Sequence, residues 1–199
     1  MIIEINAAPG LRMHLHKAIP IGAGLGGGSS DGAHALGLLD RLLLLGESRS
    51  ALMSMAASLG SDCAFFLNEG PHLATGRGEV LAPIRVDLRG WWLMLINPGV
   101  HISTAEVYKH TEMAPDREDL GSVILGTSPN GWSGSLVNTM EAHVFKTCPI
   151  VASAKSMIQE AGANYAAMSG SGSSVFGLFR EKPVLPALPH GHRGWVLPM

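Results

Sequence analysis

One segment, residues 20–31, constrains the fold more than any other part of the chain. It contains five glycines in a short space and reads Pro-Ile-Gly-Ala-Gly-Leu-Gly-Gly-Gly-Ser-Ser-Asp. Glycine tolerates positive φ angles and lets the backbone approach a ligand without a Cβ in the way. A helix that follows such a loop offers free N–H groups and the positive end of its dipole. The segment therefore predicts an anion-binding loop, best suited to phosphate, between a strand and a helix.

Other interpretations of this glycine loop fit less well. The spacing Gly22-x-Gly24-x-x-Gly27 satisfies the dinucleotide-binding motif literally, but no clear acidic residue stands at the expected ribose distance and no βαβ repeat follows. A Walker-type phosphate loop requires a Gly-Lys-Ser/Thr sequence, whereas Gly28 is followed by two serines. A flexible turn without a ligand is disfavoured, because so many glycines lose much backbone entropy on folding. Dinucleotide binding stays as an alternative.

The first half of the chain predicts strands and helices around this loop. Residues 2–7 and 11–16 show strand-like alternation on either side of a Pro-Gly turn and predict a β-hairpin. A helix is predicted from the cap-type residues 29–31 to about residue 46, and a second one over residues 50–59. Residues 83–90 are expected to join two lobes.

The second half predicts further elements of both kinds. A strand is expected over residues 91–96, and the capping-box spacing of Ser103 and Glu106 predicts a short helix. Asn138 and Glu141 repeat that cap pattern. Residues 113–135, rich in Pro, Gly, Ser and Asp, indicate a long surface connection. The remaining expectations are a helix over 149–161, strands over 165–168 and 175–179 joined by a loop, and a weakly ordered tail from residue 182 with a candidate edge strand near Trp195.

Composition limits the class of protein. The 199 residues are 46% hydrophobic and 15% charged with a net charge of −2, so the chain can bury a core and shows no basic stripe for nucleic acid. Its apolar runs fall far short of a membrane span. Residues 1–6 lack the features of a signal peptide, and Cys63 and Cys148 have no metal-ligand spacing. We expect a soluble cytoplasmic protein that binds neither membrane nor nucleic acid.

Later segments of the chain carry a resemblance to a known family. They are Leu-Gly-Ser-Asp-Cys-Ala-Phe-Phe at 59–66, residues 74–79, residues 97–104, and Met-Ser-Gly-Ser-Gly-Ser-Ser-Val-Phe at 168–176. Together with the glycine loop, and in this order, they resemble the motifs of GHMP kinases. The triple glycine with its double serine is similar to the branch that acts on 4-diphosphocytidyl-2-C-methyl-D-erythritol.

The resemblance implies a fold, an activity and a partner. The fold would be α+β with the two-lobe GHMP kinase architecture. An incomplete N-terminal ATP-binding lobe is expected over residues 1–88, and a C-terminal ferredoxin-like α/β lobe over 89–199. The activity would be ATP- and Mg²⁺-dependent phosphorylation of the 2-hydroxyl of a cytidine diphosphate-linked polyol, in the non-mevalonate route to isoprenoid precursors.

The resemblance also implies site residues. Asp62 would be the catalytic base that takes the proton of the substrate hydroxyl, whereas its residue type alone favours a helix-capping role. Ser29 or Ser30 would reach Mg²⁺, and no other metal ligand is identified. Tyr108 would stack on the cytosine ring, although a core tyrosine is an equal alternative. The residues expected to bind ATP are Pro20, Ile21, Gly22, Ala23, Gly24, Leu25, Gly26, Gly27, Gly28, Ser29 and Ser30. The residues expected to bind substrate are Thr104, Tyr108, Gly170, Ser171 and Gly172, with His101 as a weaker candidate.

The chain departs from the family in its first motif. That motif carries a lysine that assists catalysis, and no segment here matches it; Lys17 matches a different position. We therefore expect an N-terminally truncated kinase with little or no activity. Two alternatives stay open: a GHMP kinase for another small alcohol, and a non-catalytic nucleotide-binding fragment.

Overall fold

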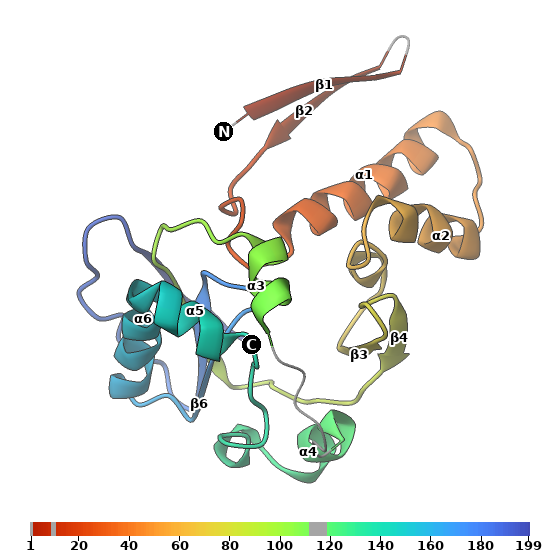
Figure 1. Cartoon of the computed structure of the whole chain (residues 1–199). Helices are drawn as coiled ribbons and strands as arrows, with labels where there is room; N and C mark the ends of the chain where they lie inside the picture. The colour runs from red at the N-terminus through yellow and green to blue at the C-terminus, as the bar shows by residue number, and fades with distance from the viewer. Residues whose placement is uncertain (1, 9–10, 112–118) are drawn as a thin grey trace.

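The computed structural model describes residues 2–8, 11–111 and 119–199 of the chain (Figure 1). Strands and helices are mixed along the sequence, and the strands pair in antiparallel fashion. The elements are β1 (Ile2–Ala8), β2 (Leu11–His16), α1 (Gly27–Leu43), α2 (Arg49–Leu59), the 3-10 helix η1 (Ala64–Leu67), β3 (His72–Thr75), β4 (Val80–Pro83), β5 (Trp92–Asn97), α3 (Thr104–His110), α4 (Leu120–Gly126), the 3-10 helix η2 (Pro129–Gly131), α5 (Glu141–Thr147), α6 (Pro149–Glu160), β6 (Tyr165–Met168), β7 (Val175–Phe179) and β8 (Arg193–Pro198). The predicted α+β class is confirmed.

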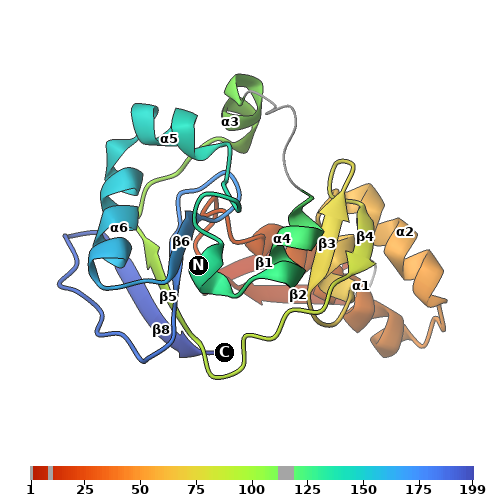
Figure 2. The same cartoon turned by 90° about the horizontal axis from the view of Figure 1, so that it is seen from below.

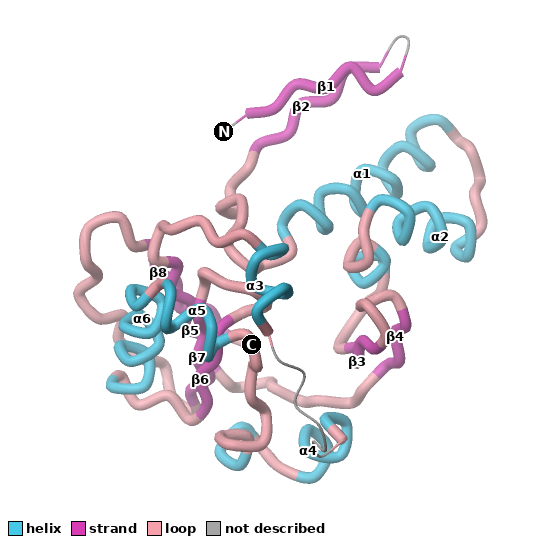
Figure 3. Tube along the Cα trace, viewed as in Figure 1, coloured by secondary structure: helices cyan, strands magenta, loops and turns pink. Residues whose placement is uncertain are grey.

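The chain opens with the predicted β-hairpin. β1 and β2 pair along their length and form a two-stranded ribbon, drawn above α1 in the view of Figures 1 and 3. Leu11, Met13 and Leu15 of β2 are half-buried and alternate with exposed residues, which is the period of a strand with one covered face. The ribbon leads directly into the glycine loop.

Two helices follow the glycine loop and pack against each other. α1 begins at Gly27 after Gly26, whose φ is +62°, and no side chain caps it. The prediction that residues 29–31 cap this helix is wrong, since they lie within it. α2 is capped by Ser48, whose hydroxyl accepts a hydrogen bond from the Ala51 N–H at 3.2 Å. Buried Ala56 of α2 belongs to a small cluster with the residues that begin η1.

A four-stranded sheet forms the centre of the C-terminal part, in the order β6-β7-β5-β8. The side chains of Met94, Ile96 and Val175 are fully buried and pack with Ile158 of α6. Helices α5 and α6 lie on this side of the sheet (Figure 2). A second cluster contains Trp91, Val123, Trp132, Tyr165, Ala167 and Leu178. The sheet is therefore flanked by two apolar clusters.

Two predictions for the C-terminal part need correction. The described portion of the expected surface connection contains α4 and η2, and Val123 of α4 is buried in the second apolar cluster; residues 113–118 of that prediction lie outside the described residues. The expected loosely ordered tail packs on the core through Leu185 and Leu188. The edge strand predicted near Trp195 is confirmed as β8.

The two predicted caps of the second half have different outcomes. Ser103 caps α3, because its hydroxyl accepts from the Glu106 N–H at 3.4 Å. The Asn138–Glu141 cap is wrong: Met140 occupies the N-cap position of α5, and no side chain caps that helix. Residues 84–90 connect β4 to β5 without a helix or strand, and the division of the chain into lobes at residue 88 stays a prediction.

Candidate active site

The glycine loop turns through three residues with left-handed backbone. Gly22, Gly24 and Gly26 have φ angles of +69°, +73° and +62°. Such angles favour glycine strongly over residues with a Cβ. The loop ends at the N-terminus of α1, where the Ser30 N–H donates to the Gly26 carbonyl oxygen at 2.8 Å. The sequence prediction of a bent backbone that leads into a helix is confirmed.

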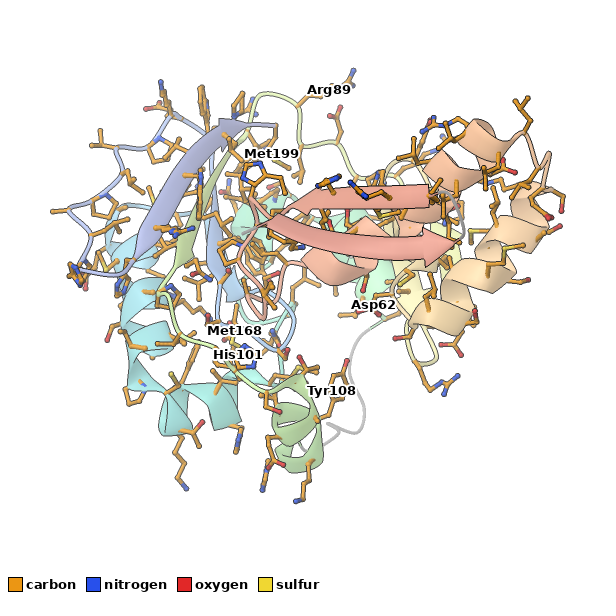
Figure 4. The ribbon with its side chains drawn as sticks, turned by 90° about the horizontal axis from the view of Figure 1, so that it is seen from above. Asp62, Arg89, His101, Tyr108, Met168 and Met199 are labelled. Carbon is orange, nitrogen blue, oxygen red and sulfur yellow. The ribbon has the colours of Figure 1, made fainter. Side chains whose placement is uncertain are left out.

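Neighbouring residues leave no room for side chains at these glycines. A Cβ at Gly24 would overlap the carbonyl oxygens of Ser169 and Gly172, which belong to the second glycine-rich loop. At Gly22 it would overlap the His101 ring. His101, placed with Met168 near the middle of the molecule in Figure 4, therefore covers the glycine loop from the side of β5.

The second glycine-rich loop, residues 169–174, connects β6 to β7 and is bonded to the first loop. The Ser169 hydroxyl donates to the Gly24 carbonyl oxygen at 2.7 Å, and the Ser174 N–H donates to the Ala23 carbonyl oxygen at 2.9 Å. These bonds join segments about 150 residues apart in the sequence. The two loops thus form one continuous backbone surface.

A cleft of about 570 Å³ opens between the two loops, α1 and α3. It brings together residues from four separate parts of the chain. Its lining is formed by Leu15, Lys17, Pro20, Ile21, Gly22, Ala23, Gly24, Leu25, Gly26, Gly27, Gly28, Ser29, Asp31, Asp62, Thr104, Tyr108, Gly170 and Ser171. Apart from the weaker candidate His101, which does not line the cleft, the lining includes all but two of the residues expected to bind ATP or substrate. The exceptions are Ser30, whose carbonyl oxygen lies 2.7 Å from the His34 Nδ1 atom, and Gly172, which packs on Met168.

Asp62 lies in the turn between α2 and η1 and is exposed to the cleft (Figure 4). In the described part of the chain, its carboxylate accepts a hydrogen bond from the Ser61 hydroxyl at 3.2 Å. Cys63 holds the N-cap position of η1, and η1 has no side-chain cap. Asp62 therefore does not perform the capping role that its residue type suggested, and its carboxylate is free to meet a ligand.

Helix α3 supplies the opposite wall of the cleft. Tyr108 is exposed rather than in the core, which removes the alternative of a core tyrosine (Figure 4). Thr104, in the first turn of α3, forms a hydroxyl–hydroxyl hydrogen bond of 2.9 Å with Ser171 of the second loop. This bond ties the helix to the loop, so that Tyr108 faces the same cleft as Asp62.

The sequence did not assign Lys17 and Asp31 to the site. Lys17 lines the cleft, its side chain is 7% exposed, and its ammonium group is paired with the Asp31 carboxylate. Among the described residues that line the cleft, Lys17 is the sole lysine or arginine. The charges of Lys17 and Asp31 beside the glycine loop could have indicated that both belong to the site. Their pairing could not be predicted, because it depends on how the chain after β2 approaches α1.

Within residues 2–8, 11–111 and 119–199, no group of three or more His, Cys, Asp or Glu side chains is arranged to hold a metal ion. No helix in this part of the chain is long and apolar enough to cross a membrane.

Comparison with known proteins gives consistent matches. Residues 1–70 match the GHMP kinases N terminal domain, and residues 117–188 match the GHMP kinases C terminal domain. A 4-diphosphocytidyl-2-C-methyl-D-erythritol kinase from Cytophaga hutchinsonii is 44% identical over 87% of this chain and 64% of its own length. The enzyme of the same name from Bacteroides thetaiotaomicron is 40% identical over 94% of this chain and 68% of its own length.

Solved structures agree with these matches. The crystal structure of a 4-(cytidine 5'-diphospho)-2C-methyl-D-erythritol kinase superposes with a TM-score of 0.69 at 31% identity, covering 84% of this chain and 60% of that one. A homoserine kinase from Cytophaga hutchinsonii superposes with a TM-score of 0.63 at 16% identity, which concerns the fold alone. The chain thus spans about two thirds of the length of its relatives. It belongs to the GHMP kinase family.

Proposed function

We propose that this chain carries the nucleotide and acceptor sites of a small-molecule kinase. Its reaction would be the ATP-dependent phosphorylation of the 2-hydroxyl of 4-diphosphocytidyl-2-C-methyl-D-erythritol, a step in the supply of isoprenoid precursors. The single observation that supports this most is the cleft that unites both glycine loops with Asp62 and Tyr108. The names of the curated relatives supply the acceptor.

The glycine loop fits a nucleotide triphosphate. Its backbone lies open to the cleft from residues 22 to 28, and the first turn of α1 contains no acidic residue that would compete for its free N–H groups. Lys17 lies at the same place, with its ammonium group paired to the Asp31 carboxylate. Backbone N–H groups, a helix N-terminus and an ammonium group are together suited to hold phosphate.

Mg²⁺ fits the side chains of the cleft as well. Magnesium is usually held by one or two carboxylates together with substrate phosphates and water, and does not need a full protein cage. Asp31, Asp62 and the Ser29 hydroxyl line the cleft and are oxygen ligands of that kind. Of the two serines considered for Mg²⁺, Ser29 is favoured because Ser30 does not line the cleft.

The remaining residues fit the acceptor alcohol. Bound ATP would supply the γ-phosphoryl group, and Mg²⁺ would offset the charge that develops on it. The Asp62 carboxylate would orient the acceptor hydroxyl and take its proton. Tyr108 offers an exposed aromatic face for the cytosine ring. Gly170 and Ser171, with Thr104 behind them, would bound the acceptor from the side of the sheet.

We also place this activity in the cytoplasm. ATP is the phosphoryl donor of the proposed reaction. Cys63 and Cys148 are both free thiols, which suits a reducing compartment.

The proposal is tested by measuring ADP release from ATP and Mg²⁺ in the presence of 4-diphosphocytidyl-2-C-methyl-D-erythritol. We expect the low acceptor-dependent turnover predicted above to fall by at least about a further hundredfold in Asp62→Asn, because the amide cannot take the proton. Asp40→Asn is the matched control, since Asp40 lies in α1 outside the cleft lining and bonds the Glu47 N–H.

Three results would contradict the proposal in different ways. Turnover with homoserine in place of the cytidine-linked acceptor would assign another alcohol. ATP binding without turnover in the folded chain would make it a nucleotide-binding unit. Turnover that Asp62→Asn leaves intact would remove Asp62 from the reaction.

A further inference from the structure

β6 pairs with β7 along one edge, and the end of its other edge is held by side chains instead of a further strand. β6 is an edge strand of the sheet, and its last residue, Met168, pairs with Val175 of β7. The Met168 N–H and carbonyl oxygen are bonded instead to Glu141 and Asn138. Both partners come from the segment that precedes and begins α5. This segment takes the place that a neighbouring strand would have.

Asn138 uses its whole amide group in this contact. Its Nδ2 atom donates to the Met168 carbonyl oxygen at 2.9 Å and to the Gly170 carbonyl oxygen at 2.7 Å. Its Oδ1 atom accepts from the Met140 N–H at 3.0 Å. An amide offers two N–H hydrogens, and both are directed at the backbone where β6 passes into the second glycine loop. Asn138 thus bridges the strand end and the loop.

Glu141 holds the same residue from its other side. Its Oε1 atom accepts from the Met168 N–H at 2.7 Å, and its Oε2 atom accepts from the Lys155 ammonium at 2.6 Å. The side chains of Glu141 and Lys155 are 11% and 18% exposed. A charged acceptor makes a stronger hydrogen bond than a neutral one, and the lysine balances the buried charge.

The loop that these two residues hold is the one that contacts the first glycine loop. Ser169 follows Met168 directly and donates to the Gly24 carbonyl oxygen, while Ser171 bonds Thr104 of α3. A shift at Met168 or Gly170 would therefore displace both contacts. Neither Asn138 nor Glu141 lines the cleft.

We infer that Asn138 and Glu141 are positioning residues for the second glycine loop, which they hold against the first loop and α3 so that the acceptor side of the cleft keeps its shape. The link between this loop and the acceptor rests on the proposed kinase function. The geometric part, that these two side chains hold the loop, is independent of it.

Hydrogen exchange of backbone amides tests the geometric part. In Asn138→Asp the side chain keeps its size but loses both donors, so we expect the amides of residues 169–174 to exchange about tenfold or more faster than in the unaltered chain. Asn164→Asp is the matched control. The Asn164 Oδ1 atom accepts from the Arg180 N–H, and a carboxylate can accept in the same way, so this variant should leave the loop unchanged.

Glu141→Gln separates the hydrogen bond from the charge. Glutamine retains an oxygen that accepts from the Met168 N–H, so we expect loop exchange close to that of the unaltered chain even though Lys155 loses its counter-charge. Glu141→Leu removes the acceptor and should speed loop exchange as Asn138→Asp does. Equal loop exchange in Asn138→Asp, Glu141→Leu and the unaltered chain would overturn the inference.

Steady-state kinetics test the functional part where the unaltered chain turns over. We expect Asn138→Asp to raise the KM for the acceptor about tenfold while the KM for ATP changes less, and we expect Glu141→Gln to leave both values close to those of the unaltered chain. If Asn138→Asp instead lowered activity only in proportion to its loss of stability, with both KM values unchanged, the positioning role would be overturned. If the unaltered chain shows no turnover, the proposed function fails, and amide exchange still decides whether these residues hold the loop.

Discussion

The two sides of the cleft differ in how many apolar side chains they bury. On the sheet side, residues 91–111 and 119–199, Met94 and Ile96 are fully buried within a large apolar cluster. On the loop side, residues 11–83, the buried cluster consists of Ala56, Cys63 and Ala64, and Leu44 is 88% exposed. The loop side supplies most of the candidate phosphate contacts, yet it contains few fully buried side chains.

This difference shows how the glycine loop obtains its shape. A loop of five glycines has little intrinsic stiffness. Its carbonyl groups at Ala23 and Gly24 are instead bonded to Ser174 and Ser169 of the sheet side. The well-packed sheet side therefore holds the glycine loop in its conformation. Substitutions on the sheet side should lower the stability of the protein more than substitutions on the loop side.

The largest effect on stability is expected in the core of the sheet side. Ile96→Ala removes a fully buried side chain and should lower the free energy of unfolding by about 3 kcal/mol. Leu44→Ala, on the loop side, should change it by no more than about 0.5 kcal/mol. Urea unfolding followed by circular dichroism, which reports on the helices and strands of both sides, measures this difference. Similar losses in the two variants would contradict the comparison.

A smaller effect is expected for the buried ion pair of the sheet side. Lys155→Met leaves the Glu141 carboxylate mostly buried without its partner, which should cost about 2 kcal/mol. The matched surface pair is Arg89 with Asp87, whose side chains are largely exposed. Arg89→Ala should give no measurable change in the urea midpoint. If Lys155→Met were as neutral as Arg89→Ala, the sheet side would be less tightly built than we conclude.

A pH-dependent effect is expected from Tyr165 of the sheet side. Burial, with a smaller contribution from the Glu141 charge, raises the pKa of the Tyr165 phenol to about 12. The unfolded chain ionises at its ordinary pKa of about 10, so the neutral phenol favours the folded state below that pH. This stabilisation, about 2 kcal/mol, should be lost as the pH rises from about 10 to about 12. In Tyr165→Phe the slope of stability against pH over this interval should become smaller, and an unchanged slope would contradict the assignment.

The smallest effect is expected within α1 on the loop side. Gly37 is a helical residue with open space around its Cα. Gly37→Ala should stabilise the chain by about 0.5–1 kcal/mol, because alanine loses less backbone entropy in a helix. Thermal unfolding followed by circular dichroism measures this change. A destabilised variant would mean that α1 is packed more closely than the structure shows.

Much of the framework followed from local patterns. The hairpin, the helices near residues 27–59 and the strands on either side of the second glycine loop have strong periodicity or clear boundaries. α4 was not predicted, since its glycine and serine residues are typical of loops. Asp119 caps it by accepting from the Ser122 N–H, and Val123 anchors it in a cluster formed by distant residues. Such an element is determined by tertiary packing, which a local pattern does not contain.

Part of the cleft lining could be predicted from sequence motifs, and its role as a site stays a proposal. The glycine loop, Asp62 and Tyr108 were expected there, and they line one cleft. The roles of Asn138 and Glu141 were not predicted, because their spacing is typical of a helix cap. Their side chains reach across to residues about 30 positions later in the sequence. A local motif cannot distinguish a bond to its own helix from a bond to a neighbouring strand.

The central claim is that the first glycine loop forms a nucleotide site in the shape that its bonds to the second glycine loop give it. Its most direct test is a calorimetric titration of ATP and Mg²⁺ into the unaltered chain, Gly24→Ala and the control Gly37→Ala. A Cβ at Gly24 would force the two loops apart, so we predict at least about tenfold weaker binding in Gly24→Ala and an unchanged affinity in Gly37→Ala. Equal affinity in all three chains, or no binding to the folded unaltered chain, would contradict the account.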